Sequence, residues 1–167
     1  MFALCRLRAC LLLAVALTLA GCSRSVDVKQ ALEVADTSSG WYDAGIVEGK
    51  NKIVPSVTFR LKKKPDADLA GVALNVVFRH PAPAGSNLEE EWDEVFIQRA
   101  DFKGANETET LTIRPEKGYT GDPPQSRLDI LRHSQFRDIR ARIFAKYSSS
   151  QWVEIGTVDV QRQLIVR

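Results

Sequence analysis

Cysteine and histidine are scarce in this chain of 167 residues, and their positions exclude two common kinds of site. All three cysteines, Cys5, Cys10 and Cys22, lie in the first 22 residues, so the rest of the chain has no disulfide framework. The two histidines, His80 and His133, have no second ligand at metal-binding spacing. The sequence therefore predicts a domain without disulfides, a metal centre or a cofactor.

The chain also lacks an excess of charge beyond its N-terminal segment. Two of its 23 basic residues, Arg6 and Arg8, lie in residues 1–21, and the other basic residues balance the 21 acidic ones. Nucleic-acid-binding domains carry a basic patch or stripe, so no nucleic-acid partner is expected. The apolar run from Leu11 to Leu19 is shorter than the roughly 20 residues that cross a bilayer.

That run instead has the order of a secretory signal: two arginines, an apolar segment and small residues before a cysteine. Its end, Leu19-Ala20-Gly21-Cys22, resembles the lipobox of bacterial lipoproteins. The resemblance implies cleavage before Cys22, a diacylglycerol on its sulfur and usually a third acyl chain. In that family a residue such as Ser23 after the cysteine directs export to the outer membrane of a two-membrane bacterium. The alternatives are an ordinary signal peptide and a short uncleaved anchor.

We therefore expect a signal peptide at 1–21, a lipidated cysteine and tether at 22–29, and one domain at 30–167. Beyond Ala31, apolar and polar residues mostly alternate between turn-forming clusters, which is typical of antiparallel strands. Seven strands are predicted: Ala31–Asp36, Lys52–Lys63, Leu69–Arg79, Trp92–Gln98, Glu107–Arg114, Asp138–Tyr147 and Gln151–Val160. This pattern predicts an all-β, immunoglobulin-like antiparallel β-sandwich with one short helix, and a small open β-barrel is the alternative.

Neighbouring strands are predicted to pair as hairpins. The first joins Lys52–Lys63 to Leu69–Arg79 through a turn at Lys64–Asp68, and the second joins Asp138–Tyr147 to Gln151–Val160. The alternation places six apolar side chains in the core: Phe59, Leu61, Leu74, Val76, Phe78 and Ile143.

Three other segments have their own signals. A glycine-rich loop is expected from Ser38 to Lys50. Asp122-Pro123-Pro124-Gln125 has the order of a capping box with proline at the first helical position, so a short helix is predicted near 123–132. The tail from 161 to 167 is predicted to extend the last strand.

The strand segments Val57–Leu61 and Val72–Phe78 also resemble the small FxLYD-type immunoglobulin-like domains of bacterial lipoproteins. That resemblance implies an immunoglobulin-like fold attached to a membrane by lipid.

No residue set specifies a reaction. His133, Ser134 and Asp138 are a close trio, but adjacent residues point apart and no Gly-x-Ser-x-Gly motif is present. The acidic run from Glu89 to Glu94 around Trp92 has the composition of a glycosidase site, of a weak cation or peptide site, or of a solvated surface, and the last is favoured. We therefore expect no catalytic residue and no enzyme.

Two groups of residues are candidate contacts besides Cys22. Four aromatic residues are possible partner contacts: Trp41, Tyr42, Trp92 and Tyr119. For the three tryptophans, Trp41, Trp92 and Trp152, packing in the core or at its rim is favoured. Tyr119 belongs to a glycine-flanked loop, Gly118–Gly121, which either approaches a partner or is a simple turn. Five basic residues are expected at the tether end of the domain, where they either face lipid phosphates or belong to a solvated turn, and the solvated turn is slightly favoured: Lys62, Lys63, Lys64, Arg99 and Lys103.

These observations predict a lipid-anchored protein at the periplasmic face of the outer membrane, with the inner membrane and cell surface left open. Its β-sandwich is expected to bind or support another cell-envelope component without catalysis. The alternative is a carrier or chaperone for an apolar ligand, which requires a cavity between the two sheets.

Overall fold

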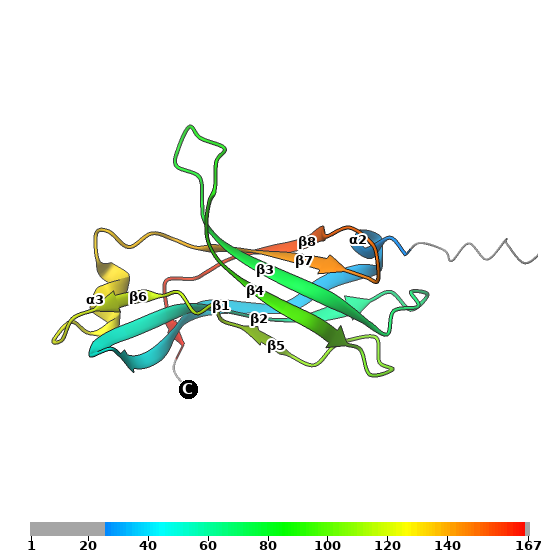
Figure 1. Ribbon diagram of the computed structural model, residues 1–167, viewed down its shortest axis with the longest axis horizontal. Helices are drawn as coiled ribbons and strands as arrows, with labels where there is room; N and C mark the ends of the chain where they lie inside the picture. Colours follow the sequence, from blue (N-terminus) through cyan, green and yellow to red (C-terminus); the bar gives the residue numbers. More distant parts are fainter. Residues whose placement is uncertain (1–25, 166–167) are drawn as a thin grey trace, which may run out of the picture.

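The computed structural model describes residues 26–165, which form nine strands and two short helices (Figure 1). One sheet has the order β5-β2-β1-β9, with β6 also paired to β2, and the other has the order β4-β3-β7-β8. The two sheets form a sandwich and no closed barrel, so the predicted all-β sandwich is confirmed. The elements are α2 (Val28–Ala31), β1 (Leu32–Val47), β2 (Lys50–Lys63), β3 (Gly71–His80), β4 (Glu90–Asp101), β5 (Leu111–Ile113), β6 (Tyr119–Gly121), α3 (Arg127–Arg132), β7 (Arg140–Lys146), β8 (Val153–Asp159) and β9 (Leu164–Ile165).

The strand order is that of immunoglobulin-like sandwiches. In one sheet β2 lies between β1 and β5, and in the other β3 lies between β4 and β7, with β8 beyond β7. Each of the seven predicted strands overlaps an observed one, and the hairpin of β7 and β8 is confirmed. The structure adds β6, β9 and α2, which are too short for sequence alternation to reveal.

The predicted hairpin between Lys52–Lys63 and Leu69–Arg79 is wrong. β2 pairs with β1, β5 and β6, whereas β3 pairs with β4 and β7 in the other sheet. Between them a turn, closed by the amide of Ala67 donating to the carbonyl of Lys64, carries the chain across the sandwich. Apolar and polar residues alternate in both strands because the apolar face of each strand points into the core, where the two faces meet. Alternation does not distinguish strands that face each other from strands that lie side by side.

The prediction of a loop from Ser38 to Lys50 is also wrong, because all of this segment except the turn at Glu48 and Gly49 belongs to strands. β1 continues to Val47, with two irregularities in its pairing to β2 between Ala35 and Ser38 and between Asp43 and Gly45. The turn into β2 is two residues long, and both Glu48 and Gly49 have positive φ angles of 52° and 78°. That geometry suits the tight turns that join twisted hairpin strands.

The predicted core is confirmed. The six apolar side chains assigned to it from strand parity are all fully buried. The largest other side chains that join them are Trp41 and Phe102, from β1 and the connection after β4. The space between the sheets is therefore filled with apolar side chains from both sheets.

The two ends of the domain differ from the predictions. Val28 is buried and belongs to α2, whose N-terminus is capped by Asp27, so the last residues of the expected tether are part of the fold. The expected signal peptide, Cys22 and the first part of the tether lie outside the described residues. At the other end, β9 does not extend β8 but crosses to pair in parallel with Trp41 and Tyr42 of β1. Gly40 allows this approach, since a Cβ there would lie 2.8 Å from Ile165 Cγ1.

The predicted helix exists but begins later than expected. Ser126, not Asp122, is the N-cap of α3: its hydroxyl accepts from the Asp129 amide at 3.2 Å, and the Asp129 carboxylate accepts from the Ser126 amide at 3.0 Å. This is a complete capping box one turn beyond the predicted one. The Ser126 hydroxyl also donates to the Asp129 carboxylate at 2.7 Å, and this bond, together with the bond from the Ser126 amide, holds the pKa of Asp129 below its usual value.

Ser126→Ala should therefore lower the free energy of unfolding at pH 7 by about 1 kcal/mol, the usual effect of losing an N-cap. Because the folded pKa of Asp129 is lowered, the contribution of its carboxylate is present at neutral pH and is lost as the pH falls through that pKa. Urea denaturation at several pH values should show that the difference in the free energy of unfolding between the variant and the wild type becomes smaller at acidic pH. The control is Ser134→Ala outside the helix, which should change stability by less than about 0.5 kcal/mol.

Candidate functional site

Three of the four aromatic residues predicted as partner contacts lie together inside the sandwich. The ring centroid of Trp41 is 5.6 Å from that of Tyr119, 6.4 Å from that of Trp92 and 4.7 Å from that of Phe136. Trp92 and Tyr119 are half-buried, and their rings stack at 5.7 Å. Trp41 is fully buried, as expected from the favoured interpretation of core packing, and it leaves no exposed surface for a partner. Its ring is part of the core and packs against the rings of Trp92, Tyr119 and Phe136.

The fourth predicted contact, Tyr42, is half-buried on β1 and stacks with the Arg114 guanidinium, whose carbon lies 3.6 Å from the ring centroid. The Gly118–Gly121 segment is neither a partner loop nor a simple turn, because Tyr119–Gly121 forms β6 and pairs with β2. A Cβ at Gly118 would lie 2.3 Å from the Ile53 carbonyl oxygen. The glycine is therefore needed for close packing within the domain.

The acidic run at the start of β4 is neutralised by arginines. The Arg137 guanidinium holds the pKa of Glu90 below its usual value. Such pairing disfavours Glu90 as the acid of a glycosidase site, since that acid needs a raised pKa. Within residues 26–165 no group of three or more His, Cys, Asp or Glu side chains is arranged to hold a metal ion. The pairs are Arg140–Glu89 and Arg142–Glu89 at 3.4 Å each, Arg137–Glu90 at 2.7 Å and Arg79–Glu91 at 2.8 Å.

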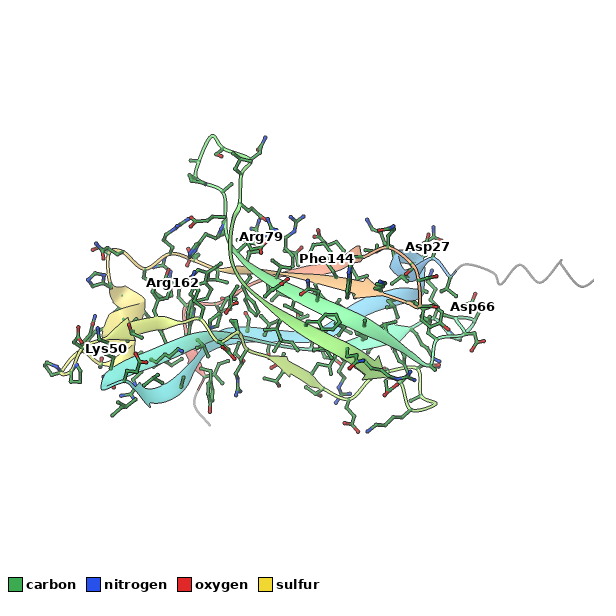
Figure 2. The ribbon with its side chains drawn as sticks, in the orientation of Figure 1. Asp27, Lys50, Asp66, Arg79, Phe144 and Arg162 are labelled. Atoms are coloured by element: carbon green, nitrogen blue, oxygen red, sulfur yellow. The ribbon has the colours of Figure 1, made fainter. Side chains whose placement is uncertain are left out.

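The predicted basic residues do lie at the end where the fold begins. The Lys64 amide donates to the Ala31 carbonyl at 3.0 Å, and Leu32 pairs with Lys63. Figure 2 shows Asp27 and Asp66 at this end and Lys50 at the opposite one. Three of the five cations have carboxylate partners there, which reduces their attraction to a lipid surface. The pairs are Lys62–Glu107 at 3.3 Å, Arg99–Asp101 at 2.5 Å and Lys103–Glu109 at 2.5 Å.

The His133, Ser134 and Asp138 trio has no catalytic alignment. The His133 Nδ1 atom accepts from the Gln135 amide at 3.2 Å, and Asp138 pairs with Arg162. The imidazole is thus bonded to backbone, and the acid that would orient it has another partner.

The most distinctive surface lies on the outer face of the β4-β3-β7-β8 sheet. Phe96 and Phe144 both pair with Asn75 of β3, so the three side chains form one row across this face. Phe96 is 60% exposed and meets the 40% exposed Trp152 edge to face, with 5.9 Å between ring centroids. Another row on this face is charged: Glu91, Arg79, Arg140 and Asp159 align from β4 to β8. The rings of Phe96 and Trp152 are therefore exposed to solvent on a face that is otherwise rich in ion pairs.

A hollow of about 470 Å³ adjoins the two rings, and we call it the aromatic hollow. Its charged lining residues are both basic. Arg99 comes from β4, where the pairing with β3 is irregular and Gln98 and Arg99 are both exposed. Lys146 ends β7, and its ammonium lies 5.8 Å from the centroid of the Trp152 ring. The lining consists of Gly71, Val72, Ala73, Phe96, Gln98, Arg99, Lys146, Tyr147, Ser148 and Trp152.

A second hollow of about 560 Å³ lies beside the β3–β4 connection, which stands out from the sandwich in Figure 1. Residues of that connection and arginines of β3 and β7 line it together, so the connection overhangs the outer face. We call it the arginine hollow: Arg79, Pro81, Ala82, Ser86, Asn87, Leu88, Glu89, Arg140 and Arg142.

The aromatic hollow was not predicted, although one signal for it was present. Phe96 has the strand parity of Glu94 and Gln98, so it belongs to the polar face of its strand. A large aromatic residue at a polar position is informative because it is not needed for the core. Sequence alternation did not show that Trp152, more than 50 residues later, would lie against it.

Comparison with known proteins gave no match: no protein-family model, curated protein or solved structure matches this chain. In residues 26–165 no helix is long and apolar enough to cross a membrane. By its fold the described part of the chain is an all-β sandwich of two mostly antiparallel sheets, with an exposed aromatic pair on one outer face.

Proposed function

We propose that this protein is a lipid-anchored component of a bacterial cell envelope whose β-sandwich binds another envelope component and catalyses no reaction. The anchor is supported by the sequence Leu19-Ala20-Gly21-Cys22. Two or three acyl chains on Cys22 would make attachment stable, because each buried methylene contributes about 0.8 kcal/mol. Ser23 favours the periplasmic face of the outer membrane as its location.

The observation that carries the binding function is the exposed Phe96–Trp152 pair beside a hollow. Exposed aromatic residues with a polar surround are typical of interaction surfaces, where Trp and Tyr supply much of the binding energy. The carrier alternative has less support, because the inter-sheet space is packed and both hollows lie on the outer surface.

The tether gives the domain an orientation in this proposal. Only residues 23–26 separate Cys22 from Asp27, where the fold begins, so the membrane lies on the order of 15 Å or less from that end. The β2–β3 turn then faces the membrane, and the β1–β2 turn near Lys50 points away from it (Figure 2).

Photo-crosslinking in cells tests the binding surface. Replacing Phe96 with a benzophenone amino acid should give a discrete crosslinked product, because that side chain lies at the proposed contact. The matched control is the same replacement at Ile46, which is 69% exposed on the other sheet and should give none. Products at both positions, or at neither, would argue against a specific site on this face.

A further inference from the structure

We infer that the aromatic hollow binds an acidic, extended segment of a partner protein, with an apolar side chain of the segment against Phe96 and Trp152. This inference rests on the proposed function and names the chemistry of the partner. Three features of the hollow support it: its charge, the packing of its aromatic rings and the shape of the surrounding face.

Charge complementarity favours an acidic partner. Arg99 and Lys146 line the hollow, and none of its ten lining residues is a carboxylate. Asp101 pairs with Arg99 from outside the lining, and the Lys146 ammonium lies over an indole ring. Carboxylates of a bound segment would meet both cations while an apolar side chain enters between them. Opposite charges at the rim of a contact mainly set specificity and association rate.

The packing of the rings favours an inserted side chain over a sugar. A sugar stacks on a bare aromatic face, but Trp152 has the Lys146 ammonium over its ring and Phe96 against it at an interplanar angle of 79°. Phe96 and Trp152 instead form a corner beside Ala73 and Tyr147. An apolar side chain in this corner would remove aromatic area from water, at roughly 25 cal/mol per Å².

The shape of the outer face disfavours a flat lipid surface. The β3–β4 connection projects from the same sheet (Figure 1). The arginine hollow is lined by residues of this connection and by Arg140 and Arg142 of β7. A polypeptide segment can lie beside this projection on the outer face, whereas a flat bilayer has to accommodate it.

Two synthetic peptides with blocked ends test this inference: one alternates glutamate with leucine, and the other replaces every glutamate with lysine. Binding to the full-length protein in mild detergent is measured by NMR shifts of the amides of Gly71–Ala73 and Phe96–Arg99. The glutamate peptide should bind about tenfold more tightly than the lysine peptide, since two rim ion pairs contribute up to about 0.7 kcal/mol each. Its affinity should also fall as salt rises.

Charge reversal provides the decisive comparison. Arg99→Glu combined with Lys146→Glu should reverse the preference, so that the lysine peptide binds more tightly. Phe96→Ser should weaken both peptides, whereas Ile46→Ser, an equally exposed change on the other sheet, should weaken neither. All four sites are exposed or half-buried, so the variants should melt like the wild type.

Equal binding of the two peptides, no binding of either, or an unchanged preference after charge reversal would overturn the inference. So would tighter binding of oligogalacturonate or of phosphatidylglycerol vesicles than of the glutamate peptide, since these probes represent an acidic sugar and a lipid surface. If crosslinking at Phe96 succeeds while the peptides fail, the proposed function stands and the acidic-segment inference falls. If crosslinking at Phe96 fails, the proposed binding function is contradicted at this surface as well.

Discussion

Replacing Phe59 with alanine is expected to lower the free energy of unfolding by about 3–5 kcal/mol. Phe59 lies in β2, pairs with Leu111 of β5 and is completely buried among the apolar side chains of both sheets. Truncation removes the ring from the core and leaves a cavity that neighbouring strands, held by their hydrogen bonds, can only partly fill. Such a loss is a large part of the total stability of a single domain, typically 5–15 kcal/mol.

Urea denaturation followed by tryptophan fluorescence measures this effect. Thr58→Ala is the matched control, because Thr58 is the preceding residue on the opposite face of β2 and its hydroxyl lies 3.3 Å from the exposed Thr112 hydroxyl. It should cost less than about 1 kcal/mol. A loss below about 1 kcal/mol for Phe59→Ala, or equal losses for the two variants, would show that the core lies elsewhere.

Replacing Cys22 with alanine should move the protein from the membrane fraction to the soluble fraction. The reason is the loss of the sulfur that would carry the diacylglycerol, and with it two or three acyl chains that hold the protein to the bilayer. No other anchor is part of the proposal. Cell fractionation with immunodetection measures the distribution, and mass spectrometry of the wild-type N-terminus measures the added lipid.

Cys10→Ala is the control for this experiment, since Cys10 lies within the segment expected to be removed. It should leave both the lipid mass and the membrane location unchanged. Retention of the Cys22→Ala protein in the membrane fraction, or a wild-type N-terminus without lipid, would remove the lipobox interpretation and the envelope location that depends on it.

Local alternation was enough to predict which side chains form the core. Phe59 and Leu61 in β2, Leu74 and Phe78 in β3, and Ile143 in β7 were all assigned to the buried face, because a strand with one face in the core must place apolar residues at every second position. The class of fold followed from repeating that pattern between turn-forming clusters.

Local alternation failed where a contact depended on distant residues. The segment around Trp41 has glycine and serine, which favour a loop, yet pairing with β2 and β9 makes it a strand. The helix start moved from Asp122 to Ser126 because two competing N-cap signals lie four residues apart. For the Trp41 segment, pairing with distant strands overrode the local preference for a loop, whereas the helix start was set by the local capping box of Ser126 and Asp129.

The sequence by itself determined the β-rich class and the buried parity of the strands, since each depends on residues close together in the chain. The anchor at Cys22 stays a prediction from the sequence. Only the tertiary structure decided that β2 and β3 face each other across the core and that Phe96 lies against Trp152. It also gave Glu89 two arginine partners on β7, about 50 residues away. Periodicity assigns a side chain to a face of its own strand, whereas its neighbours on that face are set by how separate strands pair.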